Sequence, residues 1–228
     1  MTTKVGRLSV IHTEIYQCKR CALHSGRTRT VPGAGDPNAE ILFIGEAPGE
    51  QEDKQGLPFV GRSGQYLDQL LAGIGLSRDD VFIANVVKCR PANNRDPLSD
   101  EIEACNPYLR QQIEIIDPLV IATLGRFSMN MFFPNEKISR IHGQPQFGAR
   151  RAYYPFFHPA AALRNPSLKQ DMEADFARLL DLVEEVRTRR ASENELSLEV
   201  NEEIIEVETI REDDDDAPDT PQQMGLFE

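Results

Sequence analysis

The chain has 228 residues, of which 40% are hydrophobic and 27% charged, which is enough to bury one sizeable core. No apolar run is long enough to span a membrane and residues 1–30 lack a secretory-signal pattern, so we expect a cytoplasmic protein. The formal net charge of −12 would argue against a nucleic-acid partner only if it were evenly spread.

The negative charge is concentrated at one end of the chain. Residues 191–228 hold fourteen acidic residues and one Arg, whereas residues 1–190 hold 24 Lys and Arg against 23 Asp and Glu. An acidic stretch with almost no aromatic residue predicts a disordered tail. We therefore expect one domain at 1–190, nearly neutral and compatible with a polyanionic partner, followed by a tail at 191–228.

Hydrophobic periodicity predicts helices alternating with strands along residues 1–190. In chain order, we expect a helix at 5–24, a strand at 41–44, a helix at 63–74, a strand at 81–87, a helix at 99–116 capped by Ser99, a strand at 119–125, a helix at 126–132, a strand at 152–157 and a helix at 171–189. This alternation favours a three-layer α/β/α fold around a central, mainly parallel four-stranded sheet.

Polar motifs stand at the ends of three of these strands. A Gly-Glu-Ala-Pro-Gly run follows Ile44, Asn85 lies in the second strand, and His158 follows Phe157. In parallel sheets, ligands bind beyond the carboxyl ends of the strands, so we expect a site where these three motifs meet.

All four cysteines of the chain fall into a pattern that suggests a metal centre. Cys18 and Cys21 form a Cys-x-x-Cys, and Cys89 and Cys105 are separated by fifteen residues. Two unrelated pairs of buried cysteines would be the structural alternative. Four thiolates suit a tetrahedral zinc ion or a [4Fe–4S] cluster, and spacing alone does not separate the two.

Three further residues have both a structural and a functional interpretation. Phe59, between Pro and glycines, is either a core plug or a stacking platform for a base. Asn85, in an apolar strand, either braces a loop or reads the edge of a nucleobase, because a carboxamide donates and accepts at once. A lone histidine such as His158 is more often structural than catalytic.

Taken together, the motifs resemble those of the family 4 uracil-DNA glycosylases. The similarity runs from about residue 7 to 185 and rests on the cysteine pair 18–21, Gly-Glu-Ala-Pro-Gly at 45–49, Pro-Phe-Val-Gly at 58–61, Asn85 before Lys-Cys-Arg-Pro at 88–91, Cys105, and His-Pro-Ala-Ala at 158–161. The resemblance implies a [4Fe–4S] cluster on Cys18, Cys21, Cys89 and Cys105. It also implies a monofunctional hydrolase that excises uracil from DNA in base excision repair.

The resemblance further implies roles in binding the flipped-out uracil. Phe59 would stack on the base, and Asn85 would bond O4 and N3–H and so reject cytosine. Donors to O2, where negative charge develops as the glycosidic bond breaks, would be the His158 side chain and the backbone of Gly45, Glu46 and Ala47.

Other implied roles concern water and the DNA duplex. Glu46 would orient the attacking water, although Ala47 stands where other uracil-glycosylase families carry an Asp. Leu163 and Arg164 would probe the duplex at the space left by the base. An iron–sulfur oxidoreductase and a non-catalytic DNA-damage binder are the alternatives, but the chain has no dinucleotide fingerprint and retains Glu46, Asn85 and His158.

The end of the acidic tail carries a short apolar segment. Gln223, Met224, Leu226 and Phe227 lie in a Gln-Met-Gly-Leu-Phe run that is similar to the peptides by which bacterial repair proteins bind the sliding clamp. The alternative is a random hydrophobic end. We expect a monomer, associated with the nucleoid through its DNA substrate, whose extended tail presents this peptide.

Overall fold

The structure is a computed structural model that describes residues 3–192. The chain divides into two compact units, residues 1–187 and 188–228, and the following description concerns the first. The expected clamp-binding peptide and nearly all of the expected tail lie outside the described residues. No helix among residues 3–192 combines the length and the apolar character needed to cross a membrane.

A single mixed sheet forms the centre of the first unit. Its six strands lie in the order β1 (Ala34–Gly35), β3 (Phe82–Asn85), β2 (Ile41–Gly45), β4 (Val120–Leu124), β6 (Ala152–Phe156) and β5 (Gln146–Phe147). The four central strands are parallel, which confirms the predicted fold class. The two edge strands pair antiparallel and were not predicted, since two residues are too few to show a periodic pattern.

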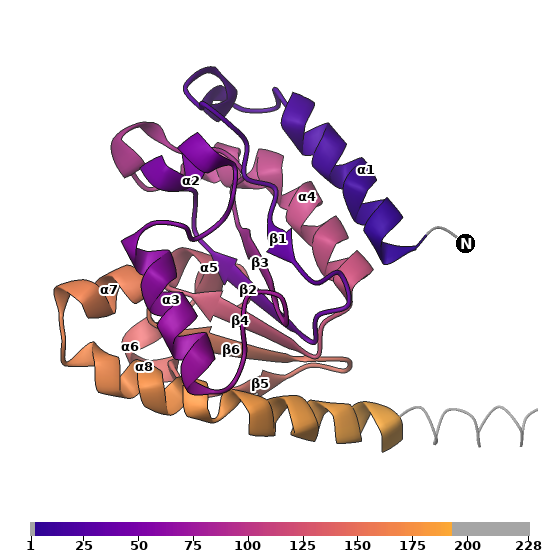
Figure 1. Cartoon of the computed structure of the whole chain (residues 1–228), viewed down its shortest axis with the longest axis vertical. Coiled ribbons are helices and arrows are strands. Elements are labelled where there is room, and N and C mark those ends of the chain that lie inside the picture. Colours follow the sequence, from indigo (N-terminus) through magenta and orange to yellow (C-terminus); the bar gives the residue numbers. More distant parts are fainter. Residues whose placement is uncertain (1–2, 193–228) are drawn as a thin grey trace, which may run out of the picture. The chain divides into compact units, whose positions relative to one another are not determined.

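Helices cover both faces of the sheet, giving three layers (Figure 1). One face carries α1 (Lys4–Gln17) and α4 (Ser99–Ile116), which pack on each other. The opposite face carries α3 (Arg62–Gly73), α7 (Pro159–Arg164), α8 (Leu168–Ala177) and a further helical stretch at 179–187. Short helices complete the unit: α2 (Glu50–Gln55), α5 (Arg126–Asn130), α6 (Ile138–Ile141) and the 3₁₀ turns η1 (Ala22–Ser25) and η2 (Ala92–Asn94).

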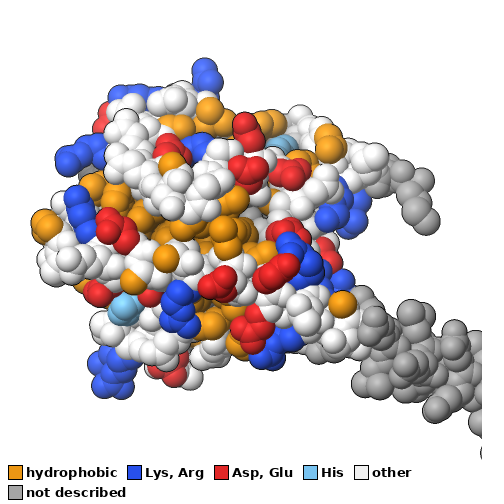
Figure 2. Space-filling view, turned by 60° about the horizontal axis from the view of Figure 1, so that its bottom comes forward, with side chains coloured by type: hydrophobic (Ala, Val, Ile, Leu, Met, Phe, Trp, Pro, Cys, Tyr) orange, Lys and Arg blue, Asp and Glu red, His pale blue; other side chains and the backbone are white. Residues whose placement is uncertain are grey.

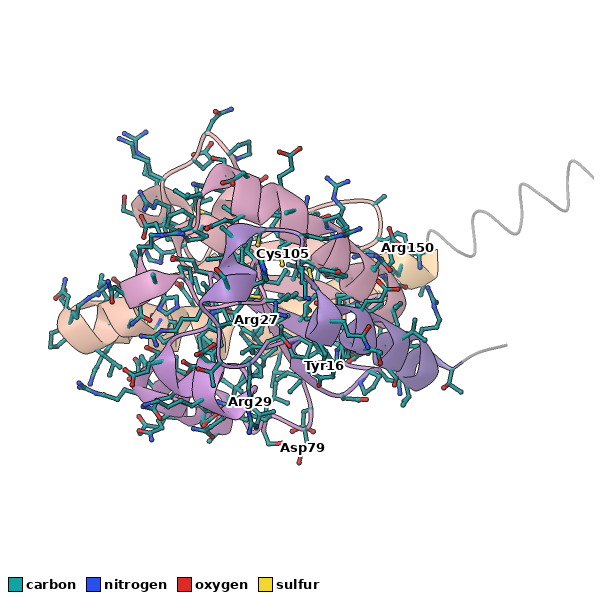
Figure 3. All side chains as sticks on the ribbon, turned by 90° about the horizontal axis from the view of Figure 1, so that it is seen from above. Tyr16, Arg27, Arg29, Asp79, Cys105 and Arg150 are labelled. Carbon is teal, nitrogen blue, oxygen red and sulfur yellow. The ribbon has the colours of Figure 1, made fainter. Side chains whose placement is uncertain are left out.

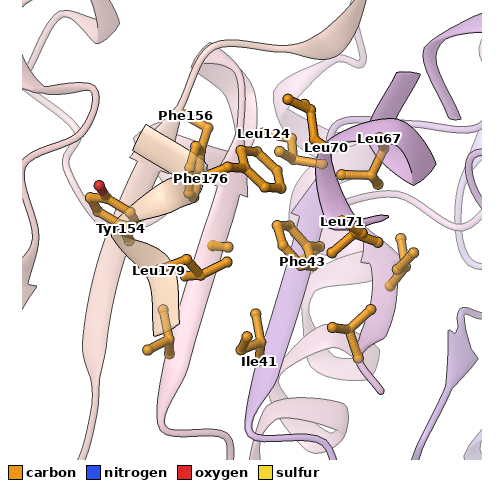
Figure 4. Close-up of a cluster of buried hydrophobic side chains, with 14 of the residues drawn as sticks. Ile41, Phe43, Leu67, Leu70, Leu71, Leu124, Tyr154, Phe156, Phe176 and Leu179 are labelled. Atoms are coloured by element: carbon orange, nitrogen blue, oxygen red, sulfur yellow. The ribbon is translucent and has the colours of Figure 1, made fainter. Parts of the chain in front are cut away.

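The four central strands are mostly apolar, and each face of the sheet has its own core. Alternate residues such as Phe43 point to the α3 and α8 side, where the Phe43 ring stacks on that of Phe176 with centroids 5.7 Å apart (Figure 4). Their neighbours, such as Leu42 and Ile44, point to the α1 and α4 side. Burial on both faces is typical of parallel sheets and fixes the register of the four central strands.

The first helix is shorter than predicted, whereas the predicted bounds of the helix at 99–116 are confirmed and only its capping residue differs. The first helix ends at Gln17 instead of continuing through the cysteine pair, because Cys18 takes an extended conformation that turns the chain away from the helix. The helix α4 begins at Ser99, so Ser99 is its first residue and Leu98 is the cap. The carboxylate of Glu101 accepts the Leu98 N–H at 2.8 Å, which supplies the capping bond expected from Ser99.

The last predicted helix is also divided. It begins earlier, with α8 at Leu168, and is interrupted at Arg178, which lies in a turn.

On the face drawn in Figure 2, Lys and Arg side chains are interspersed with Asp and Glu. This mixture is consistent with the nearly neutral charge of residues 1–190.

Candidate functional site

The three polar motifs meet in an open pocket at the carboxyl edge of the sheet. The pocket is bordered by Asn85 of β3, by residues of α2, α3 and α7, and by the loops between these elements, including Glu46, Ala47, Phe59, His158 and Arg164. Its outer wall is formed by Pro91, Asn94, Arg95 and Asp96. The sheet edge therefore brings together side chains that are more than a hundred residues apart in the sequence.

Asn85 is the most unusual polar residue of the pocket. It ends β3 opposite Gly45 of β2, and its side chain is 1% exposed. Neither the oxygen nor the nitrogen of its carboxamide has a hydrogen-bond partner among the described residues. Leaving a buried polar group unpaired costs about 1–3 kcal/mol, so this amide is suited to a ligand that both donates and accepts.

Phe59 is held beside this amide in a strained backbone conformation. Its φ of 51° lies in the left-handed region, which is rare for an aromatic residue. A Cβ on Gly45 would lie 2.6 Å from the Phe59 ring and 2.5 Å from Asn85 Oδ1, so Gly45 allows the ring and the amide to share one corner of the pocket. The ring centroid is also 5.8 Å from that of His158.

Two charged residues hold the Phe59 loop in place. Arg78 donates to the carbonyl of Pro58 at 2.9 Å and to the carbonyl of Phe59. Glu52 accepts the Val60 N–H at 2.9 Å and the Gly61 N–H at 2.8 Å. Backbone groups on both sides of Phe59 are therefore fixed by ionic side chains, which compensates for the strained φ.

His158 presents a defined ring nitrogen to the pocket. It is the N-cap of α7, and its Nδ1 accepts the backbone N–H of Ala160 at 3.1 Å. Burial, and secondarily Arg164, lowers the pKa of His158 to about 4. The imidazole is therefore neutral near pH 7, and because Nδ1 accepts, its proton resides on Nε2.

Glu46 has the opposite pKa shift. Its side chain is half-buried, and burial followed by the charge of Asp96 raises its pKa to about 7, while Arg126 opposes this shift. A carboxyl group whose pKa lies near the ambient pH is suited to general base chemistry.

The four cysteines line a second cavity between α1 and α4. All four thiols are free, and Cys89 and Cys105 are buried. Within residues 3–192, no three His, Cys, Asp or Glu side chains are gathered so as to share a single metal ion.

N–H groups point at the two buried sulfur atoms. Arg27 Nη1 lies 3.2 Å from Cys89 Sγ, and the backbone N–H of Lys88 lies 3.3 Å from Cys105 Sγ. Arg27 and Cys105 are labelled in Figure 3, and both border the cavity. Burial raises the pKa of Cys105 to about 11, so in the absence of a bound cation this thiol stays protonated, and burial also raises the pKa of Cys89.

Comparison with known proteins identifies the family. Residues 32–182 match the uracil DNA glycosylase superfamily. The chain is 49% identical to a type-4 uracil-DNA glycosylase of Sulfurisphaera tokodaii over 77% of this chain and 84% of that protein. It is 45% identical to the type-4 enzyme of Archaeoglobus fulgidus over 77% and 92% of the two chains. The chain belongs to the type-4 uracil-DNA glycosylases.

Similarity to another branch of the superfamily is weaker. A type-5 uracil-DNA glycosylase of Thermus thermophilus is 33% identical over 58% of this chain and 62% of that protein. Membership in the type-4 family favours a glycosylase over the iron–sulfur oxidoreductase and the non-catalytic binder that the sequence left open.

The structure does not place every expected residue in the pocket. Arg164 borders it, but Leu163 packs against the core on the α3 side and is absent from the pocket lining.

The sequence analysis did not single out Glu52, Arg78 and Lys88 as functional residues. The usable signal was a charged residue inside or beside an otherwise apolar motif, as with Lys88 directly before Cys89.

Proposed function

We propose that this chain excises uracil from DNA by hydrolysing the N-glycosidic bond, using the pocket at the carboxyl edge of the sheet. The unpaired, buried carboxamide of Asn85 is the observation that carries the proposal. Uracil presents an acceptor at O4 next to a donor at N3, and the amide complements both. Cytosine reverses this pattern and would leave both amide atoms unpaired, which disfavours its binding.

The rest of the pocket supports binding and activation of a flipped-out base. The fixed ring of Phe59 offers a flat apolar surface on which the uracil stacks. The Nε2–H of His158, assisted by the backbone N–H groups of Gly45, Glu46 and Ala47, donates to O2 as negative charge develops there. The neutral imidazole still carries one N–H, so it can donate to the developing anion while keeping its proton.

Hydrolysis requires a water molecule on the sugar side of the bond. The carboxylate of Glu46 orients this water and accepts its proton as the sugar carbon becomes electron-deficient. No lysine is found among the described residues that line the pocket, which supports hydrolysis over attack by an amine. Arg62, Arg95 and Arg164 line the border of the pocket and would meet the phosphates.

We further propose that Cys18, Cys21, Cys89 and Cys105 hold a [4Fe–4S] cluster. A cubane takes one thiolate at each of four separated corners, which agrees with thiols arranged around a cavity and not gathered around one point. When bound, the cluster supplies a cross-link between the segment after α1, the end of β3 and α4. Protein purified without oxygen should be brown and contain about four irons per chain, and stoichiometric zinc without iron would contradict this.

Activity is tested directly with oligonucleotides. The protein should convert a duplex with one uracil into an alkali-labile abasic product and leave an identical duplex with thymine or cytosine at that position intact. Single-stranded uracil DNA, tested in parallel, measures the strand preference. Absence of alkali-labile sites with iron-loaded protein would overturn the proposed reaction.

The terminal peptide is proposed, from sequence alone, to bind a sliding clamp. Deleting residues 219–228, or replacing Leu226 and Phe227 together by Ala, should abolish clamp binding in calorimetry and leave cleavage of a short oligonucleotide unchanged. Equal clamp affinity of full-length and truncated protein would refute it.

A further inference from the structure

Lys88 is a fully buried cation between the cysteine cavity and the base pocket. Its side chain is 1% exposed and borders the same cavity as the four cysteines. Its Nζ donates to the backbone carbonyl of Asn85 at 2.8 Å and to Oε1 of Gln112 at 2.7 Å. Gln112 is itself fully buried and is fixed by a bond from its Nε2 to the carbonyl of Pro32 at 2.8 Å.

Both acceptors of Lys88 are neutral oxygen atoms. Among the ion pairs of the described residues, none provides Lys88 with a carboxylate. Burying an ammonium without an anion is costly, so a negative charge close by would stabilise the charged form of Lys88. The cysteine thiolates are the candidates, since Cys105 Sγ already accepts the backbone N–H of Lys88.

We propose that Lys88 is a positioning residue that provides the buried counter-charge for a thiolate-bound cluster and fixes the backbone of Asn85. The proposal rests on the [4Fe–4S] cluster proposed above, whose four thiolates would make it a net anion. Because the same ammonium bonds to the last residue of β3, the charge of the cluster and the placement of the uracil-reading amide depend on one side chain.

The test compares Lys88→Met with Lys4→Met. Met has a similar length without charge, and Lys4 likewise donates from Nζ to a carbonyl, that of Ile116 at 2.8 Å, but does not border the cysteine cavity. Iron content, the reduction potential of the cluster, and KM and kcat on uracil DNA are measured for each variant and for the wild type.

In Lys88→Met the cluster should have a lower reduction potential than in Lys4→Met, because loss of a nearby positive charge favours the oxidised, less negative cluster. The specificity constant for uracil DNA should fall about tenfold, as about 1.4 kcal/mol of positioning is lost. Folded Lys88→Met protein that binds no iron also supports the counter-charge. A potential and a specificity constant equal to those of Lys4→Met overturn the inference.

A second pair of variants covers the case in which Lys88→Met does not fold. Gln112→Glu places an anion beside Lys88, whereas Gln112→Leu removes the contacts of the amide with Lys88 and Pro32 without adding charge. The potential should be lower in Gln112→Glu than in Gln112→Leu, and equal values refute the proposal. Wild-type protein without iron would instead refute the cluster itself, and the inference with it, so the two failures are distinguishable.

Discussion

The cysteine cavity and the base pocket lie at opposite ends of one short segment, and they differ in whether their buried polar groups have hydrogen-bond partners. At the cavity, N–H groups of Arg27 and Lys88 already point at buried sulfur atoms. At the pocket, the carboxamide of Asn85 has no partner among the described residues, and Phe59 is held at a strained φ. The buried sulfur atoms of the cavity therefore already have hydrogen-bond donors, while the pocket retains unmet hydrogen bonds that a substrate can satisfy.

The two regions are nevertheless joined. Only three residues separate Asn85 from Cys89, and the segment that follows Cys89 forms the outer wall of the pocket before it enters α4. Arg95 in this wall is fixed by Glu101 of α4 through contacts of 2.6 and 2.9 Å. A substitution of a cysteine in the cavity should therefore also change the pocket, whereas a substitution of a pocket residue should leave the cavity unchanged.

Replacing Cys105 by Ala should have the largest effect. With one thiolate missing, the cluster should be lost, and because α4 and the pocket wall are then no longer cross-linked, stability and cleavage should both fall. Iron analysis, thermal unfolding and the oligonucleotide assay measure the three effects. Full iron content in Cys105→Ala would show that this thiol is not a ligand.

His158→Ala should reduce the rate of uracil cleavage about a hundredfold or more, since one donor to a developing anion contributes on the order of 3 kcal/mol. Iron content and substrate binding should change little. His142→Ala is the matched control, because His142 is half-buried but bonds to Asp175 at 2.9 Å outside the pocket. Cleavage by His158→Ala at the wild-type rate would eliminate the imidazole as the O2 donor.

Asn85→Asp should weaken uracil recognition by about 2 kcal/mol, or roughly thirtyfold in the specificity constant. A carboxylate cannot donate to O4 and is repelled by it. The effect should appear in kcat/KM measured on uracil DNA, with the cluster retained. A variant as specific as the wild type would place base recognition elsewhere in the pocket.

The pH profile should report Glu46. Its pKa is raised to about 7 and the ionised form is the base, so kcat/KM should rise roughly tenfold from pH 6 to pH 8 and then level off. His158, with a pKa lowered to about 4, should add no step in this range. In Glu46→Gln the step should disappear, with a smaller loss of rate than in His158→Ala; a step that persists belongs to another group.

Arg78→Leu should have the smallest effect, roughly a fivefold rise in KM. The reason is that the hydrogen bonds of Arg78 stabilise the Phe59 loop by about 1 kcal/mol. The bonds to the Pro58 and Phe59 carbonyls are lost, but Glu52 still holds the N–H groups on the other side. Arg187→Leu, which removes a surface ion pair with Glu40, is the control and should leave KM unchanged. Equal KM values for the two variants would mean that Phe59 does not depend on Arg78.

Much of this arrangement could be predicted from the sequence because it follows from local chemistry. The apolar strand segments specified a parallel sheet buried on both faces, and the polar motifs at their ends specified the edge where the pocket forms. Gly45, Asn85 and His158 were recognisable because each motif carries its chemistry within a few residues. The family resemblance was likewise readable from these motifs and confirmed by comparison.

Other features arise only when distant segments meet. The left-handed φ of Phe59 is held by Arg78 and Glu52, whose contacts with the loop depend on the packing of α2 and α3. The neutral state of His158 follows from burial, which no linear pattern encodes. Lys88 looked like one basic residue in a Lys-Cys-Arg-Pro motif, and only the folded chain places its ammonium between Gln112, Asn85 and the cysteines, because burial and charge balance are properties of tertiary contacts.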